Sequence, residues 1–114
     1  MNRRCGLDVA ALLAGVAAVA STASAADDKA KAYGKHLSAE CTACHRLDGV
    51  DNGIPSIVGW PEANFKSALE AFQSGARTNE VMVSVAQSLD AGQVAALAAY
   101  FGSLPKRGGP PPRR

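Results

Sequence analysis

The stretch Cys41-Thr42-Ala43-Cys44-His45 contains two cysteines three positions apart, followed directly by a histidine. Residues three apart lie on one side of a helix, so both thiols can reach the same planar ligand. C-x-x-C-H is the attachment pattern of a covalent c-type haem. In this interpretation Cys41 and Cys44 each bond to the porphyrin, and His45 binds the iron as its proximal ligand.

Two other interpretations of the cysteine pair remain as alternatives. C-x-x-C also occurs in thioredoxin-type redox pairs and as half of a zinc site. A zinc site would need a second pair of ligands, and Cys5 is the only other cysteine in the sequence. No strand pattern precedes the motif, as a thioredoxin βαβ unit would require. The sequence therefore favours one covalent haem c.

Residues 1–25 have the organisation of a secretory signal peptide. Arg3 and Arg4 form a basic start, an apolar run extends from Val9 to Ala20, and residues 23–25 fit the A-x-A cleavage pattern. We therefore expect cleavage after Ala25 and a periplasmic protein, in agreement with bacterial haem attachment on the outer side of the inner membrane. The apolar run is too short for a comfortable membrane span. No stable span should remain after cleavage, and an uncleaved anchor is the alternative.

The rest of the chain predicts one domain over residues 26–105 and a flexible basic tail over 106–114. The domain carries more acidic than basic side chains, whereas the tail combines Lys106 and three arginines with Gly and Pro. No basic patch with interleaved aromatic residues is present, so nucleic-acid binding is not expected.

The hydrophobic pattern predicts an all-α fold of about four helices. A first helix is expected over residues 27–44 with Asp27 or Asp28 as its cap, and a second over residues 61–74. Asn79 can cap a short third helix, and Asp90 with Gln93 forms a capping box for the last one. Residues 46–59 should be irregular. The expected buried stripes are Phe65, Ala68, Leu69 and Phe72, then Val94, Leu97, Ala98 and Phe101.

Met82 is the candidate for the second axial ligand of the iron. It is the only methionine outside the signal peptide, and it lies beyond a full predicted helix from His45. Met82 could instead be core filler. The rival ligand, His36, shares a predicted helix with His45 and should stay on the proximal side, at the surface. Ligation by His and Met fills both axial sites and suits one-electron transfer, whereas an open site would suit a sensor or a peroxidase-like protein.

The chain resembles class I c-type cytochromes over about residues 30–104. The resemblance is carried by the segments 41–45, 53–59, 74–77 with Met82, and 97–101. It is most similar to the monohaem cytochrome subunit of flavocytochrome c sulfide dehydrogenase and related small bacterial cytochromes c. The resemblance implies a fold wrapped around one covalent haem, with His45 and Met82 as axial ligands.

The same resemblance implies roles for several further residues. The carbonyl of Pro55 would accept a hydrogen bond from Nδ1–H of His45, and Gly34 would lie where the last helix crosses. Arg77 or Trp60 could pair with a haem propionate, although a surface arginine and a half-buried core tryptophan are the alternatives. Arg46 departs from the family, in which Gly often follows the haem histidine.

These observations predict a periplasmic monohaem c-type cytochrome that carries single electrons between redox partners. It should have no catalytic groups of its own. Its partners would be a flavoprotein dehydrogenase or a terminal oxidase or reductase. One alternative is the electron-accepting cytochrome subunit of a flavocytochrome c sulfide dehydrogenase. The other is a haem sensor or peroxidase-like protein with a labile sixth ligand.

Overall fold

The computed structural model describes residues 17–106, with side chains from residue 22 onward. This part of the chain contains five helices and no strand, so the all-α prediction is confirmed. The helices are α1 (Ala17–Leu37), α2 (Ala39–Thr42), α3 (Glu62–Gln73), α4 (Glu80–Gln87) and α5 (Ala91–Ser103). Most of the predicted signal peptide and residues 107–114 of the predicted tail lie outside the described residues.

The first helix begins earlier than the sequence pattern predicted, so the prediction that Asp27 or Asp28 caps it is wrong. Residues 17–26 consist mainly of alanine, the strongest helix former, and α1 therefore runs through them without a break. Asp27 instead pairs with Lys31 one turn further on, at 2.5 Å. The predicted single helix is also interrupted at Ser38, where the hydroxyl donates to the carbonyl of Lys35 at 2.7 Å.

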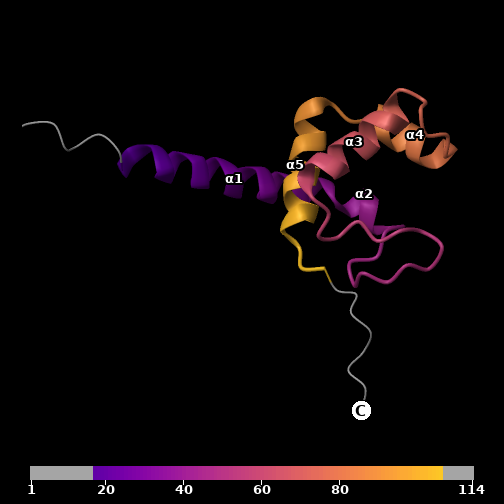
Figure 1. The fold of residues 1–114 in the computed structure, drawn as a ribbon, viewed down its shortest axis with the longest axis horizontal. Helices are drawn as coiled ribbons and strands as arrows, with labels where there is room; N and C mark the ends of the chain where they lie inside the picture. The colour runs from indigo at the N-terminus through magenta and orange to yellow at the C-terminus, as the bar shows by residue number, and fades with distance from the viewer. Residues whose placement is uncertain (1–16, 107–114) are drawn as a thin grey trace, which may run out of the picture.

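The crossing of α1 and α5 organises the fold. A Cβ atom built on Gly34 would lie 2.0 Å from the carbonyl oxygen of Ala96 and 2.7 Å from Cβ of Tyr100. The two backbones can approach this closely only because Gly34 has no side chain. Figure 1 shows α1 passing α5 and extending away from the other helices at its N-terminal end. The close crossing expected at Gly34 is thus present.

The later helices begin where their caps predict. Asn79 caps α4 by accepting a hydrogen bond from the backbone N–H of Met82 at 3.0 Å. Asp90 and Gln93 form a complete capping box at the start of α5, with bonds of 2.8 and 3.0 Å. These side chains thus fix the starts of α4 and α5.

The hydrophobic core lies where α3, α4 and α5 meet the segment before α3. Its aromatic centre is the stacked pair Phe65 and Phe101, with ring centroids 5.6 Å apart. The core cluster consists of Ile57, Val58, Phe65, Leu69, Phe72, Ala86, Val94, Leu97, Ala98 and Phe101. The stripes predicted for α3 and α5 are buried, except that Ala68 is only half-buried.

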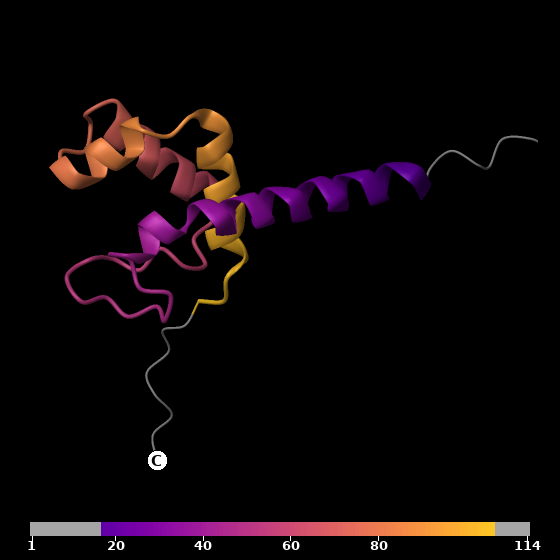
Figure 2. The same ribbon diagram turned by 180° about the vertical axis from the view of Figure 1, so that it is seen from behind.

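The two views agree on how the site-bearing segments are arranged. Figures 1 and 2 show α3 and α4 on one side, and α2 with the irregular segment 43–61 on the other. Both groups lie beside α5, away from the projecting end of α1. The fold thereby places Cys41 in α2 and Met82 in α4 on different groups of elements.

Of the described helices, none alone has the length and apolar composition of a membrane span. Taken together, α4 and α5 do have that length and composition, but the chain bends by 114° between them.

Candidate functional site

The two cysteines of the motif lie at the end of α2 and in the turn that follows it. Cys41 is half-buried and packs against the core cluster, whereas Cys44 is exposed. Burial raises the pKa of the Cys41 thiol, and the neighbouring Glu40 carboxylate raises it further. The turn is closed by the N–H of His45, which donates to the carbonyl of Cys41 at 2.8 Å. The helical turn thus brings both thiols and the imidazole into one short segment.

His45 is held by a backbone carbonyl from the irregular segment. Its Nδ1 lies 2.7 Å from the carbonyl oxygen of Pro55, and only 8% of the residue is exposed. A carbonyl can only accept a hydrogen bond, so the contact requires a proton on Nδ1. In a neutral imidazole this leaves the lone pair on Nε2 available to a metal. This is the contact that the family resemblance implied for Pro55.

Arg46 and Asp48 form an ion pair within the turn that follows His45. The guanidinium donates to both carboxylate oxygens of Asp48, from Nε at 2.9 and 3.1 Å and also from a terminal nitrogen. The same carboxylate accepts the backbone N–H of Val50 at 3.0 Å. The bonds from Arg46 hold the pKa of Asp48 at about 2, below its usual range. The charge of Arg46 is therefore balanced locally.

This ion pair predicts how the turn responds to acid. The pKa of Asp48 is lower in the folded state than in the unfolded chain, so its contribution is present above about pH 4 and lost as the pH falls through 2. We expect the protection factor of the Val50 amide in hydrogen exchange to fall between pH 5 and pH 2. In Asp48→Asn, which keeps an acceptor but has no titrating group, the protection should not change over this range. An unchanged wild-type protection factor at pH 2 would contradict the assignment.

Met82 occupies the first turn of α4, where Asn79 holds its backbone N–H. Its side chain is half-buried and packs against the same core cluster as Cys41. Over residues 17–106, no Cα atom of α2 comes within 8 Å of one in α4. The two segments that carry the predicted ligands therefore contact the same core, while their backbones lie apart.

The chemistry of this donor set fits a c-type haem. The motif supplies two thiols for the porphyrin and an imidazole whose Nδ1 is already engaged, and Met82 supplies a thioether, a known partner of histidine on haem iron. Three apolar residues of the irregular segment differ in exposure: Ile57 and Val58 are buried in the core, whereas Ile54 is 38% exposed. Ile54 thus remains at the surface of the protein.

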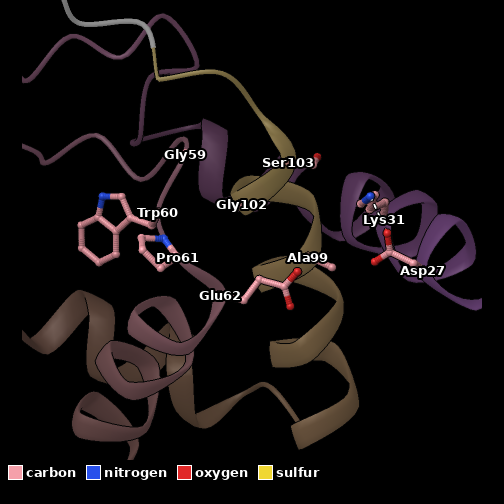
Figure 3. A pocket seen from close by; sticks show the side chains of 9 residues that line it. All are labelled: Asp27, Lys31, Gly59, Trp60, Pro61, Glu62, Ala99, Gly102 and Ser103. Carbon is pink, nitrogen blue, oxygen red and sulfur yellow. Dashed lines mark ion pairs between the residues drawn. The ribbon is translucent and has the colours of Figure 1, made fainter. Parts of the chain in front are cut away.

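A pocket of about 360 Å³ lies apart from Cys41, Cys44, His45 and Met82. Figure 3 shows the side chains that line it. Asp27 and Lys31 reach it from α1, Glu62 from the start of α3, and Ala99 and Gly102 from α5. None of the predicted haem ligands lines it. Trp60, considered above as a propionate partner, does line it, so the pocket lies outside the set of predicted ligands but beside one candidate residue.

Trp60, Arg77 and His36, which the sequence also singled out, lie in the core or at the surface of the protein. Trp60 is half-buried against the core, and Arg77 is exposed with its guanidinium 4.5 Å from the centre of the Phe72 ring. His36 is exposed, as expected.

Gln73, which no sequence pattern singles out, joins α3 to the C-terminal end of α4. Its side-chain nitrogen donates to the carbonyls of Ala86 at 2.9 Å and Leu89 at 3.2 Å. Both acceptors belong to the backbone and lie more than ten residues away, so no local pattern could have indicated the contact.

No family model matches the chain. Three curated proteins are similar to it. The "thiosulfate dehydrogenase electron acceptor" of Thiomonas intermedia is 42% identical over 66% of this chain and 36% of that protein. The "cytochrome subunit of sulfide dehydrogenase" of Chlorobaculum tepidum is 37% identical over 65% of this chain and 68% of that protein. "Cytochrome c-552" of Acidithiobacillus ferridurans is 33% identical over 73% of this chain and 40% of that protein.

The chain thus spans well under half of the first and third relatives, and about two thirds of the second. All three relatives are named as cytochromes or electron acceptors, which fits the C-x-x-C-H motif and the all-helical fold. The chain belongs to the small c-type cytochromes, whose function is electron transfer.

Proposed function

We propose that this protein is a periplasmic carrier of single electrons with one haem, attached through Cys41 and Cys44 and ligated by His45 and Met82. The observation that carries the proposal is the 2.7 Å contact between Nδ1 of His45 and the carbonyl of Pro55. It fixes the tautomer in which Nε2 can bind iron, directly after the two thiols. When bound, haem supplies a one-electron couple between ferric and ferrous iron.

The protein's own residues would occupy both axial positions of the iron in both oxidation states. The hydrogen bond to Pro55 orients the imidazole ring and increases its basicity as a ligand. A thioether from Met82 would fill the opposite position and raise the reduction potential relative to a pair of histidines. With both positions filled by the protein, small molecules have no open coordination site. This arrangement favours electron transfer over peroxidase-like or sensor activity.

Export also forms part of the proposal. Cleavage after Ala25 would remove the first nine residues of α1 as the structure describes it. Asp27 and Asp28 would then lie in the first turn of the shortened helix, where carboxylates interact favourably with the helix dipole. N-terminal sequencing of the protein from the periplasm should give Ala26. A retained N-terminus would support an anchored protein instead.

The electron donor would be a dehydrogenase that oxidises a reduced inorganic sulfur compound. The names of two relatives support this choice, since one accepts electrons from thiosulfate dehydrogenase and the other is a subunit of sulfide dehydrogenase. The main proposal is a freely diffusing carrier. The alternative is a subunit bound permanently to a flavoprotein that oxidises sulfide.

Reduction by purified dehydrogenases tests the choice of donor. Ferric protein is mixed with catalytic amounts of thiosulfate dehydrogenase and thiosulfate, or of sulfide dehydrogenase and sulfide, and its reduction is followed by absorbance. Each substrate without enzyme is the control, because sulfide can reduce haem directly. We expect at least one enzyme to accelerate reduction strongly, and co-elution with it in gel filtration would favour the subunit. No acceleration by either enzyme would contradict a sulfur-linked donor.

A further inference from the structure

We propose that Gln73 is a positioning residue for Met82, because it fastens the C-terminal end of α4 to α3. The inference rests on the proposed function, in which Met82 is an axial ligand. It adds Gln73, which lies outside the haem motif and in a different helix from Met82.

Helix α4 packs on the core through Ala86, which is fully buried, and through the half-buried Met82 and Val83. It has only eight residues, too few to be stable alone in water. Among the helices that the structure describes, α3 is the only one whose Cα atoms approach α4 within 8 Å. The start of α4 is secured by Asn79, whose side chain binds the N–H of Met82. The other end is held by the packing of Ala86 and by one further attachment.

Gln73 provides that attachment from the last turn of α3. Its neighbour Phe72 is buried in the core, so the backbone at this point is fixed by packing. The side-chain amide carries two N–H groups, and it donates to two carbonyls, that of Ala86 in α4 and that of Leu89 just after it. The Ala86 carbonyl also accepts the backbone N–H of Leu89 at 3.2 Å, so Gln73 adds a further donor there, and its second bond reaches the chain just beyond the helix.

The two attachments lie on either side of Met82. Asn79 fixes the turn that contains Met82, and Gln73 fixes the end of the same helix one to two turns later. If the second attachment is lost, α4 can tilt about its first turn while its start stays capped. The sulfur of Met82 would then spend less time at bonding distance from the iron. The sixth coordination position would become easier to open.

Substitution of Gln73 by Glu tests this directly. Glu has nearly the same size, but its carboxylate would face the two carbonyls with acceptors instead of donors. Gln87→Glu is the matched control, because it places the same charge at the exposed end of the same helix. Three quantities are measured on each haem-loaded protein. They are the temperature at which the red thioether-to-iron absorption band of the ferric form disappears, the uptake of carbon monoxide by the ferrous form, and the loss of helix by circular dichroism.

In Gln73→Glu we expect the red band to be lost at a temperature about 5 to 15 °C below that of the wild type. Carbon monoxide uptake should rise about tenfold. Helix loss should shift by less than the band, so that the ligand is released from a folded protein. Gln87→Glu should match the wild type in all three.

Two results would overturn the inference. One is a band temperature in Gln73→Glu equal to that of Gln87→Glu. The other is simultaneous loss of the band and of helix in every variant, which would give Gln73 a structural role only. Failure of the proposed function is distinguished by the wild type itself. If Met82 is not the ligand, the wild type lacks the red band or retains it in Met82→Ala.

Discussion

Replacing Gly34 by alanine is expected to lower the unfolding free energy of the haem-loaded protein by about 3 kcal/mol or more. The added Cβ would lie 2.0 Å from the carbonyl oxygen of Ala96 and 2.6 Å from its carbonyl carbon. Both are backbone atoms of α5, so no side-chain rotation can relieve the clash. The helices α1 and α5 would have to separate at their closest point.

Thermal unfolding of Gly34→Ala measures the effect. For a domain of this size, the expected loss corresponds to a decrease in Tm of roughly 10 to 20 °C. Gly92→Ala is the matched control, since Gly92 is an exposed residue in the first turn of α5 and the nearest atom to its added Cβ is a carboxylate oxygen of Asp90 at 3.3 Å. That control should stay within about 1 kcal/mol of the wild type. Equal Tm values for the two variants would show that the crossing is not as close as described.

Replacing Met82 by alanine is expected to open the sixth coordination position without unfolding the protein. Met82 is half-buried at the edge of the core, so its truncation removes some packing while the capped helix α4 remains. The ferric protein should lose the red thioether-to-iron band completely. The ferrous protein should bind carbon monoxide readily, and the reduction potential should fall.

Met82→His separates ligation from packing. A histidine at this position offers nitrogen in place of sulfur, so the protein should lack the red band, resist carbon monoxide, and have a lower potential than the wild type. If Met82→Ala kept the band, or if wild-type ferrous protein took up carbon monoxide readily, Met82 would not be the ligand. The haem sensor or peroxidase-like protein would then be the better interpretation.

Much of the fold could be predicted because its helices are defined by local signals. Asn79 and Asp90 sit in front of amphipathic segments, and the hydrogen bonds that define a cap lie within three residues. The motif at residues 41–45 likewise places its chemistry within one turn of chain. Such features can be recognised before the fold is known.

The remaining features depend on distant parts of the chain or on competing local preferences. The predicted start of α1 was wrong because the alanines before Asp27 favour helix more strongly than Asp27 and Asp28 favour a cap. The two carbonyls that Gln73 binds are brought to it only by packing of α4 on α3. The contact of His45 with Pro55 also spans an irregular segment, and its role was expected from the family resemblance instead of from spacing.

The central claim is that Cys41 and Cys44 hold one haem covalently. Its most direct test is the intact mass, under denaturing conditions, of the exported protein and of the variant with Cys41→Ala and Cys44→Ala. We predict that the wild type carries the added mass of one haem and that the double variant carries none. A wild-type protein without haem mass, or two proteins with the same added mass, would contradict the account.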